Sequence, residues 1–108
     1  MVILQSASDA VREARHANRR AVRHAMANGV NDVSGMLYRN HEFRQRDFCL
    51  SWARRYQLAA KTAASSTDRQ IVVMLNSVSR TGPKSVERLA FRAEAERRRA
   101  TAPTRLAA

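Results

Sequence analysis

The chain has 108 residues, which is enough for one compact domain and little else, because a single core usually needs about 50 to 200 residues. Its 20 Lys and Arg residues outnumber its 9 Asp and Glu residues and leave a formal charge of +11, a surplus that a compact chain tolerates best beside a polyanion. We expect no signal peptide, no membrane span and, with a single cysteine, no internal disulfide. These features indicate an intracellular protein whose partner is a polyanion.

The first predicted helix runs from about Asp9 to Asn28. Ser6 or Ser8 offers an N-terminal cap, and Gly29 ends the helix. Alanines recur on one face at helical spacing: Ala10, Ala14, Ala17, Ala21 and Ala25. The opposite face contains Arg12, Arg15, Arg19 and Arg23 and no acid. We therefore expect that pairing within the helix does not neutralise the arginine face and that external phosphates do. An alanine face buries little area, so this helix needs a partner with larger side chains.

The second predicted helix begins near Met36 and continues from about Glu42 to Ala64. One of its faces contains Phe48, Trp52, Tyr56 and Ala59. We interpret this face as a core or a dimer seam, because the alanine-rich helices need the few aromatic residues for packing. Stacking on unpaired bases is the alternative role for these aromatics. Basic side chains flank the face: Arg44, Arg46, Arg54, Arg55 and Lys61.

Two shorter helices are predicted in the second half of the chain. The third runs from Asp68 to about Val78, and its apolar residues recur at helical rather than strand spacing. The fourth runs from Pro83 to about Arg99. Residues 101–108 contain Pro103 and no periodicity, so we expect a disordered tail there. The pattern predicts an all-α fold with one domain over residues 1–100.

Catalytic and metal-ligating patterns are absent from the sequence. His16, His24 and His41 have no cluster of Cys or carboxylate residues to complete a metal site. There is no phosphate-binding loop, no Gly-rich dinucleotide turn and no serine elbow. Cys49 has no His paired with it in sequence context and fits a structural role better than a nucleophilic one. We therefore expect no enzyme activity, no cofactor, no metal site and no small-molecule substrate.

Residues 41 to 99 show an ordered set of features that resembles a known viral family. A Cys in the long second helix is followed by basic residues, a short helix rich in Val and Leu, a Pro-marked turn and a Glu-Arg-Leu helix. This order resembles the small double-stranded-RNA-binding silencing suppressors of nodaviruses. The resemblance implies a helical hairpin with short C-terminal helices that pairs as an antiparallel dimeric four-helix bundle. Such a homodimer lies along one side of an A-form duplex in the host cytoplasm and hides it from the silencing machinery.

The resemblance also implies a set of contact residues. Cys49 matches a family cysteine near the dimer axis on the RNA face, and Arg54 matches a basic position of the same helix. Two other basic positions of the family fall on Trp52 and near Ala59, so substitutes are expected. The predicted RNA-binding set is Arg15, Arg19, Arg39, Arg46, Cys49, Arg54, Arg55 and Lys61.

The sequence thus predicts a protein that binds double-stranded RNA without reading its bases and suppresses RNA silencing. Shape and phosphate or 2′-OH contacts suffice for this, because the major groove of A-form RNA is too deep and narrow for side chains. Two alternatives stay open: a helical DNA-binding regulator or packaging factor of a phage or plasmid, and a basic inhibitor that binds an acidic protein surface. The link from Ser79 to Lys84 between two short helices is the feature that suggests the first alternative.

Overall fold

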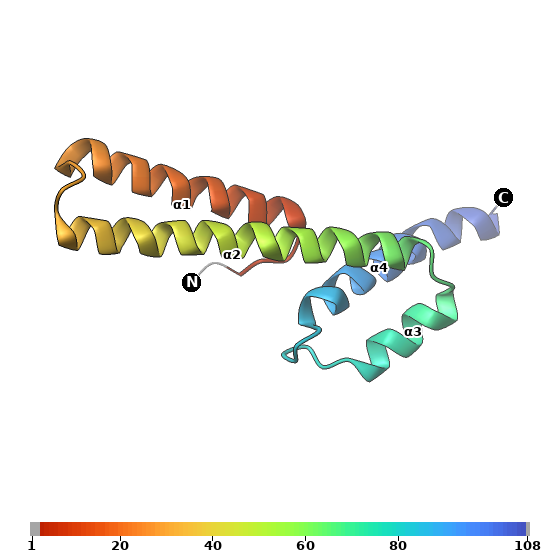
Figure 1. Ribbon diagram of the computed structural model, residues 1–108. Helices are drawn as coiled ribbons and strands as arrows, with labels where there is room; N and C mark the ends of the chain where they lie inside the picture. Colours follow the sequence, from red (N-terminus) through yellow and green to blue (C-terminus); the bar gives the residue numbers. More distant parts are fainter. Residues whose placement is uncertain (1–2, 108) are drawn as a thin grey trace. The chain divides into compact units, whose positions relative to one another are not determined.

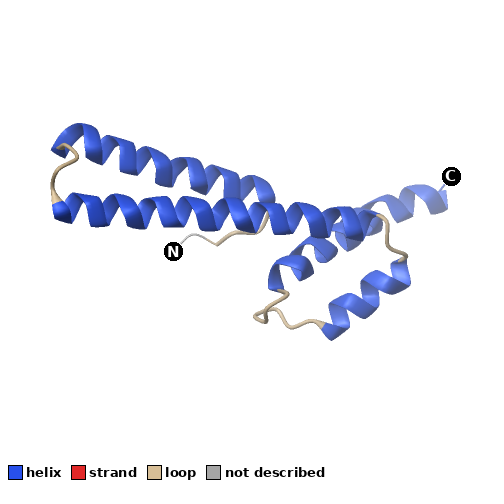
Figure 2. Ribbon diagram, in the orientation of Figure 1, coloured by secondary structure: helices blue, strands red, loops and turns tan. Residues whose placement is uncertain are grey.

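The computed structural model describes the backbone of residues 3–107 and the side chains of residues 3–102. This part of the chain forms α-helices and no strand, which confirms the predicted all-α class (Figure 2). The helices are α1 (Ala7–Asn28), α2 (Val33–Ala64), α3 (Asp68–Ser77) and α4 (Ser85–Ala107) (Figure 1). The chain divides into two compact units: an N-terminal unit, Met1–Arg54, and a C-terminal unit, Arg55–Ala108.

The N-terminal unit is a helical hairpin in which α1 and the first part of α2 lie antiparallel, side by side (Figure 1). The Ser6 hydroxyl accepts a hydrogen bond from the Asp9 N–H at 3.2 Å and caps α1. Gly29, with a φ of 76°, ends the helix, and its N–H donates to the Ala25 carbonyl at 2.8 Å. Both ends of the predicted first helix are therefore confirmed to within two residues.

The core of this hairpin consists of small side chains. Ala10, Ala14, Cys49 and Ala53 form a buried cluster, against which Leu4, Val11 and Trp52 pack. Ala17 and Ala21 are buried as well, so α1 buries the alanine face that its sequence predicts. Among the described residues, Cys49 is the largest side chain that is fully buried. The sequence predicts that larger side chains pack against the alanine face of α1. Within this unit, the larger side chains that do so are only partly buried and lie at the border of the cluster.

Phe48 does not belong to this core, because its side chain is 59% exposed. The face of α2 that packs on α1 contains Cys49 and Ala53. Because successive residues of a helix are about 100° apart, Cys49 lies about 100° and Ala53 about 140° around α2 from Phe48. The physical reason is the alanine face of α1, which lets the two helices approach closely and leaves room between them only for small side chains. Trp52 lies at the border of this face, partly buried.

The link between α1 and α2 is shorter than predicted, because the sequence predicts a second helix from near Met36 and α2 begins at Val33. α2 begins at Val33, because the Asp32 carboxylate accepts hydrogen bonds from the N–H groups of Ser34 and Gly35. The buried Arg39 guanidinium donates to the Gly29 carbonyl at 3.1 Å and the Val30 carbonyl at 3.2 Å. Arg39 therefore fixes the turn of the hairpin from inside.

The C-terminal unit has a core of larger side chains. Ala63, Ile71 and Phe91 form its buried cluster, with Met74, Leu75 and Ala95 packed against it. α3 starts at a capping box, in which Thr67 and Gln70 each bind the other's backbone N–H. It includes residues 71–75, which confirms the predicted helix over the alternative of a strand.

The last helix differs from the prediction at both ends. α4 begins at Ser85 instead of Pro83 and continues to Ala107, where we predicted an end near Arg99 and disorder from residue 101. Ala100 and Ala102 have high helix propensity, and the Thr101 hydroxyl donates to the Arg98 carbonyl at 3.0 Å, so the backbone stays helical beyond Arg99. Residue 108 of the predicted tail lies outside the described residues.

Candidate nucleic-acid interface

Carboxylates neutralise only part of the positive charge, and the structure shows which part. All nine carboxylates lie in the described residues, and each has a partner within the chain. Asp32 binds the backbone of α2, and the others form ion pairs with arginines. The arginines that are paired in this way are Arg12, Arg20, Arg46, Arg55, Arg92, Arg97 and Arg98. No carboxylate is left for the other cations of the described part of the chain.

Three of the remaining cations form a row on α1. Arg15, Arg19 and Arg23 are exposed and have no hydrogen bond or ion pair to any described residue. They stand one helical turn apart, so their Cα atoms rise by about 6 Å from one to the next. We call these three residues the arginine row. Arg12 is not part of it, because Asp9 pairs with Arg12 at 3.2 Å. The expectation that pairing within the helix neutralises none of this face is therefore wrong for Arg12.

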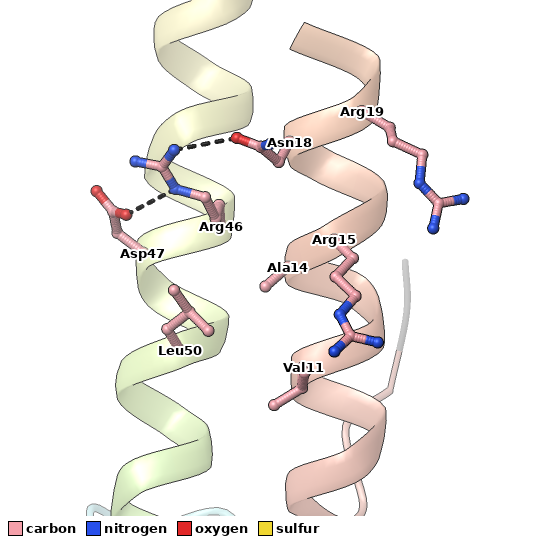
Figure 3. A pocket seen from close by; sticks show the side chains of 8 residues that line it. All are labelled: Val11, Ala14, Arg15, Asn18, Arg19, Arg46, Asp47 and Leu50. Carbon is pink, nitrogen blue, oxygen red and sulfur yellow. Dashed lines mark hydrogen bonds and ion pairs between the residues drawn. The ribbon is translucent and has the colours of Figure 1, made fainter. Parts of the chain in front are cut away.

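A groove of about 600 Å³ lies beside the arginine row, between α1 and α2 of the N-terminal unit. Its lining is mixed: Val11, Ala14, Arg15, Asn18 and Arg19 from α1, and Arg46, Asp47 and Leu50 from α2 (Figure 3). Figure 3 shows Val11 and Ala14 between the helices, whereas the Arg19 side chain points away from α2. The groove thus has an apolar floor and a cationic border.

Arg46 is held in one position at this border. Its Nη1 donates to Asn18 Oδ1 of α1 at 3.1 Å, and its Nε donates to Asp47 Oδ1 at 3.0 Å (Figure 3). The guanidinium also lies over the Phe43 ring, 4.8 Å from the ring centroid. Arg46 therefore connects the two helices, and only part of its hydrogen-bonding capacity is left for a ligand.

The other predicted contact residues lie in different environments. Arg39 and Cys49 are buried in the N-terminal unit, so neither side chain reaches the surface that the arginine row forms. Arg54 is exposed and has no partner among the described residues. In the C-terminal unit, Arg55 binds both oxygens of Glu87 and the Pro83 carbonyl, and Lys61 is exposed.

The other residues of the predicted aromatic face of α2 are at least partly buried. Trp52 and Tyr56 are partly buried, and Ala59 is buried. The structure brings Arg15, Arg19 and Arg46 together at one groove. Arg23 does not line this groove and is not in the predicted contact set, but it continues the arginine row on the α1 face for which the sequence predicts phosphates.

The Cys49 thiol is not suited to act as a nucleophile. Burial raises its pKa, and the negative charge of Glu13 adds to that rise against a smaller opposite effect of Arg20. A thiol with a raised pKa forms little of the reactive thiolate near neutral pH. Its contacts with Ala10, Ala14 and Ala53 indicate a packing role.

Comparison with known proteins does not assign the chain to a family. No family model, no curated protein and no solved structure matches the chain. Within residues 3–107, no three His, Cys, Asp or Glu side chains gather as metal ligands do. None of the helices over the same residues combines the length and apolar character needed to cross a bilayer. A function must therefore be inferred from the charged surface itself.

Proposed function

We propose that the protein binds double-stranded RNA without reading its sequence and shields the duplex from the host silencing machinery. The observation that supports this proposal is the arginine row, three exposed guanidinium groups for which the described part of the chain supplies no carboxylate. Charged groups that remain unpaired in a folded chain repel one another, and phosphates relieve this repulsion. The resemblance to the nodavirus suppressors supplies duplex RNA as the particular polyanion.

The form of the surface favours contact with a backbone over contact with bases. The arginine row lies along a straight helix, and guanidinium groups bind phosphate oxygens with two parallel hydrogen bonds. The deep major groove of A-form RNA excludes such a helix, but the phosphates and the shallow minor groove stay accessible. Binding of this kind depends on duplex shape and charge and not on sequence.

The same proposal includes an antiparallel homodimer, which the small core of the N-terminal unit favours. Cys49 is the largest fully buried side chain described, so the unit buries little apolar area for its length. Large apolar side chains are instead exposed: Val22, Met26, Met36 and Leu50.

Leu50 lines the groove, and Val22 and Met26 follow Val11 and Asn18 at helical spacing on the same border of α1. A second copy packed on this border would bury them, and we place the dimer seam there instead of on Phe48. Arg15 and Arg19 line the same groove, so the arginine row would stand at the edge of this seam, where the two copies offer one cationic surface to a duplex.

A binding panel tests the first part of the proposal. Fluorescence anisotropy with an RNA duplex, a DNA duplex and single strands of one arbitrary sequence should show the tightest binding for the RNA duplex. The triple variant Arg15→Gln, Arg19→Gln, Arg23→Gln should bind that duplex at least about tenfold more weakly, because charged contacts are lost in both copies of a dimer. Each lost phosphate contact should also reduce the slope of log Kd against log salt by about one.

The matched control removes the same charge from paired arginines. The variant Arg12→Gln, Arg92→Gln, Arg97→Gln replaces three exposed guanidinium groups that already bind carboxylates. It should weaken binding clearly less than the row variant. Equal losses would mean that net charge alone determines affinity. If the protein prefers the DNA duplex, the alternative of a DNA-binding regulator or packaging factor is favoured. If it binds no nucleic acid, the alternative of a basic inhibitor of an acidic protein is favoured.

Sedimentation tests the homodimer. Wild type should sediment as about twice 12.2 kDa, and Leu50→Asp should shift it to the monomer by placing a charge in the seam. Arg44→Asp, outside the groove, is the control. A wild-type monomer that binds the duplex tightly would contradict the dimer and leave the RNA proposal intact.

A further inference from the structure

One flank of α2, about 100° around the helix from Cys49 of the packing face, has an exposed aromatic ring one turn from a cation. Phe48 is 59% exposed, and Arg44 precedes it by one helical turn, exposed and without a partner among the described residues. His41, also exposed, lies a further turn or so along the same stripe. Neither hydrophobic cluster of the described chain includes Phe48.

Phe48 stands at the end of the aromatic series that continues with Trp52 and Tyr56, with polar side chains beside it. Arg44 and Ser51, one turn away on either side, are exposed, whereas Trp52 packs against the α1–α2 core and Tyr56 is partly buried. Phe48 is therefore the ring of this series that stays accessible. The nearest carboxylate in sequence, Asp47, is bound to Arg46. The Arg44 charge is therefore available to an external anion.

We infer that Phe48 and Arg44 form a site for an unpaired nucleotide, with the base stacked on the Phe48 ring and the phosphate bound by Arg44. An exposed aromatic ring next to a cation is the combination by which proteins bind single-stranded nucleic acid, because every base has a flat face and carries a phosphate. The inference rests on the proposed function and makes it more specific: the substrate is an RNA duplex that has an unpaired extension. The duplex would be bound by the arginine row, and an extension long enough to pass around α2 would be bound by Phe48 and Arg44, because Phe48 lies about 200° around the helix from Leu50 of the groove.

Two RNA duplexes that differ only in an unpaired 3′ extension test this inference. Wild type should bind the extended duplex about tenfold more tightly than the blunt one, which is the effect of about one stacked base. A 2-aminopurine base placed in the extension should change its fluorescence on binding, since that signal reports stacking. Phe48→Ala should remove both effects and leave the affinity for the blunt duplex unchanged. Arg44→Gln should reduce the preference and keep the blunt-duplex affinity within about twofold.

Two further variants separate stacking from apolar packing. Phe48→Tyr keeps an aromatic ring and should keep the preference, whereas Phe48→Leu keeps apolar volume without a ring and should lose it. Equal binding of the two duplexes by wild type, or full activity of Phe48→Leu, would overturn the inference. Conversion of Phe48→Ala to a monomer in sedimentation would also overturn it and make Phe48 a seam residue. Failure to bind even the blunt duplex would contradict the proposed function. The blunt-duplex affinity is measured separately from the preference for the extension, so the two failures are distinguishable.

Discussion

In the C-terminal unit, Arg98 donates hydrogen bonds to the carbonyls of Ala63 and Ser66 and to the carboxylates of Asp68 and Glu94. In the N-terminal unit, the arginine row makes no such bond to any described residue. Arg98 thus closes the end of α2, whereas the three arginines of the row face solvent. Arginine content alone does not locate a binding surface; the supply of carboxylates and helix-end carbonyls nearby decides which arginines remain accessible.

The cores of the two units differ in the size of their buried side chains. The C-terminal unit buries Ile71 and Phe91, whereas the buried cluster of the N-terminal unit has only alanine and cysteine. A larger buried side chain removes more apolar area from water and stabilises more. We therefore expect the C-terminal unit to depend on its own core, and the N-terminal unit to depend on whatever covers its exposed apolar border.

The largest effect is expected from Phe91→Ala. Truncation of this buried aromatic should lower the free energy of unfolding by about 3 to 5 kcal/mol. Hydrogen exchange should show the loss of protection in α3 and α4, while amides of α1 keep theirs. Phe91→Leu is the conservative control and should cost under about 1.5 kcal/mol. An equal loss of protection in α1 would show that the units unfold together and remove the basis of the comparison.

Arg39→Met should have the next largest effect. It keeps apolar volume but leaves the Gly29 and Val30 carbonyls without the guanidinium, a loss of about 1.5 to 3 kcal/mol in urea unfolding. Arg39→Lys should not restore stability, since one ammonium lacks the planar fork that binds two carbonyls. The exposed control, Arg44→Met, should change stability by under about 0.5 kcal/mol. If Arg39→Met is as stable as wild type and binds RNA poorly, Arg39 is a contact residue after all.

A smaller effect should appear in the pH dependence of the C-terminal unit. Hydrogen bonds from Arg97 and then Arg98 lower the pKa of Glu94 to about 2. Because this pKa is below that of the unfolded chain, about 4.3, the bonds stabilise the fold fully above that pH. The contribution is lost as the pH falls toward the folded pKa. Thermal unfolding between about pH 5 and 2 should therefore decline less for Glu94→Gln than for wild type. Identical pH profiles would contradict this role of the carboxylate.

The smallest effect is expected from Cys49→Ala. The change removes one buried atom from a cluster of alanines and should cost about 1 kcal/mol or less in urea unfolding. Cys49→Val, by contrast, adds volume where the helices approach closely and should cost more than Cys49→Ala. If the valine variant proves the more stable of the two, the core of the N-terminal unit has unfilled space beside Cys49, and the helices do not approach as closely as the alanine face requires.

Local signals predicted the helix ends where a side chain caps its own backbone. Ser6 and Gly29 lie where the sequence places a cap and a stop, and Thr67 caps α3 directly before its predicted start at Asp68. The start of α2 lies earlier than predicted because residues 28–35, with two Gly and two Asn, favour a link, whereas the Asp32 carboxylate caps the helix within them. The end of α4 lies later than predicted because Pro103 favours a stop, whereas Ala100 and Ala102 before it favour a helix.

The candidate site was predictable only as far as helical periodicity determines it. Spacing places Arg15 and Arg19 on the outer face of α1, and the structure agrees. Spacing does not reveal partners that are distant in sequence, such as Asn18 for Arg46 or Glu87 for Arg55. It also does not show which face of α2 packs, because the choice between Phe48 and Cys49 depends on the size of the alanines opposite.

The position of Trp52 makes the chain its own spectroscopic probe. It is the one tryptophan of the sequence, and it packs partly buried against the α1–α2 core of the N-terminal unit. Its indole emission therefore reports the opening of that hairpin, whereas circular dichroism reports the helices of both units. A difference between the two transition midpoints would give the stability of each unit from a single unlabelled sample, and coincident midpoints would show one cooperative transition.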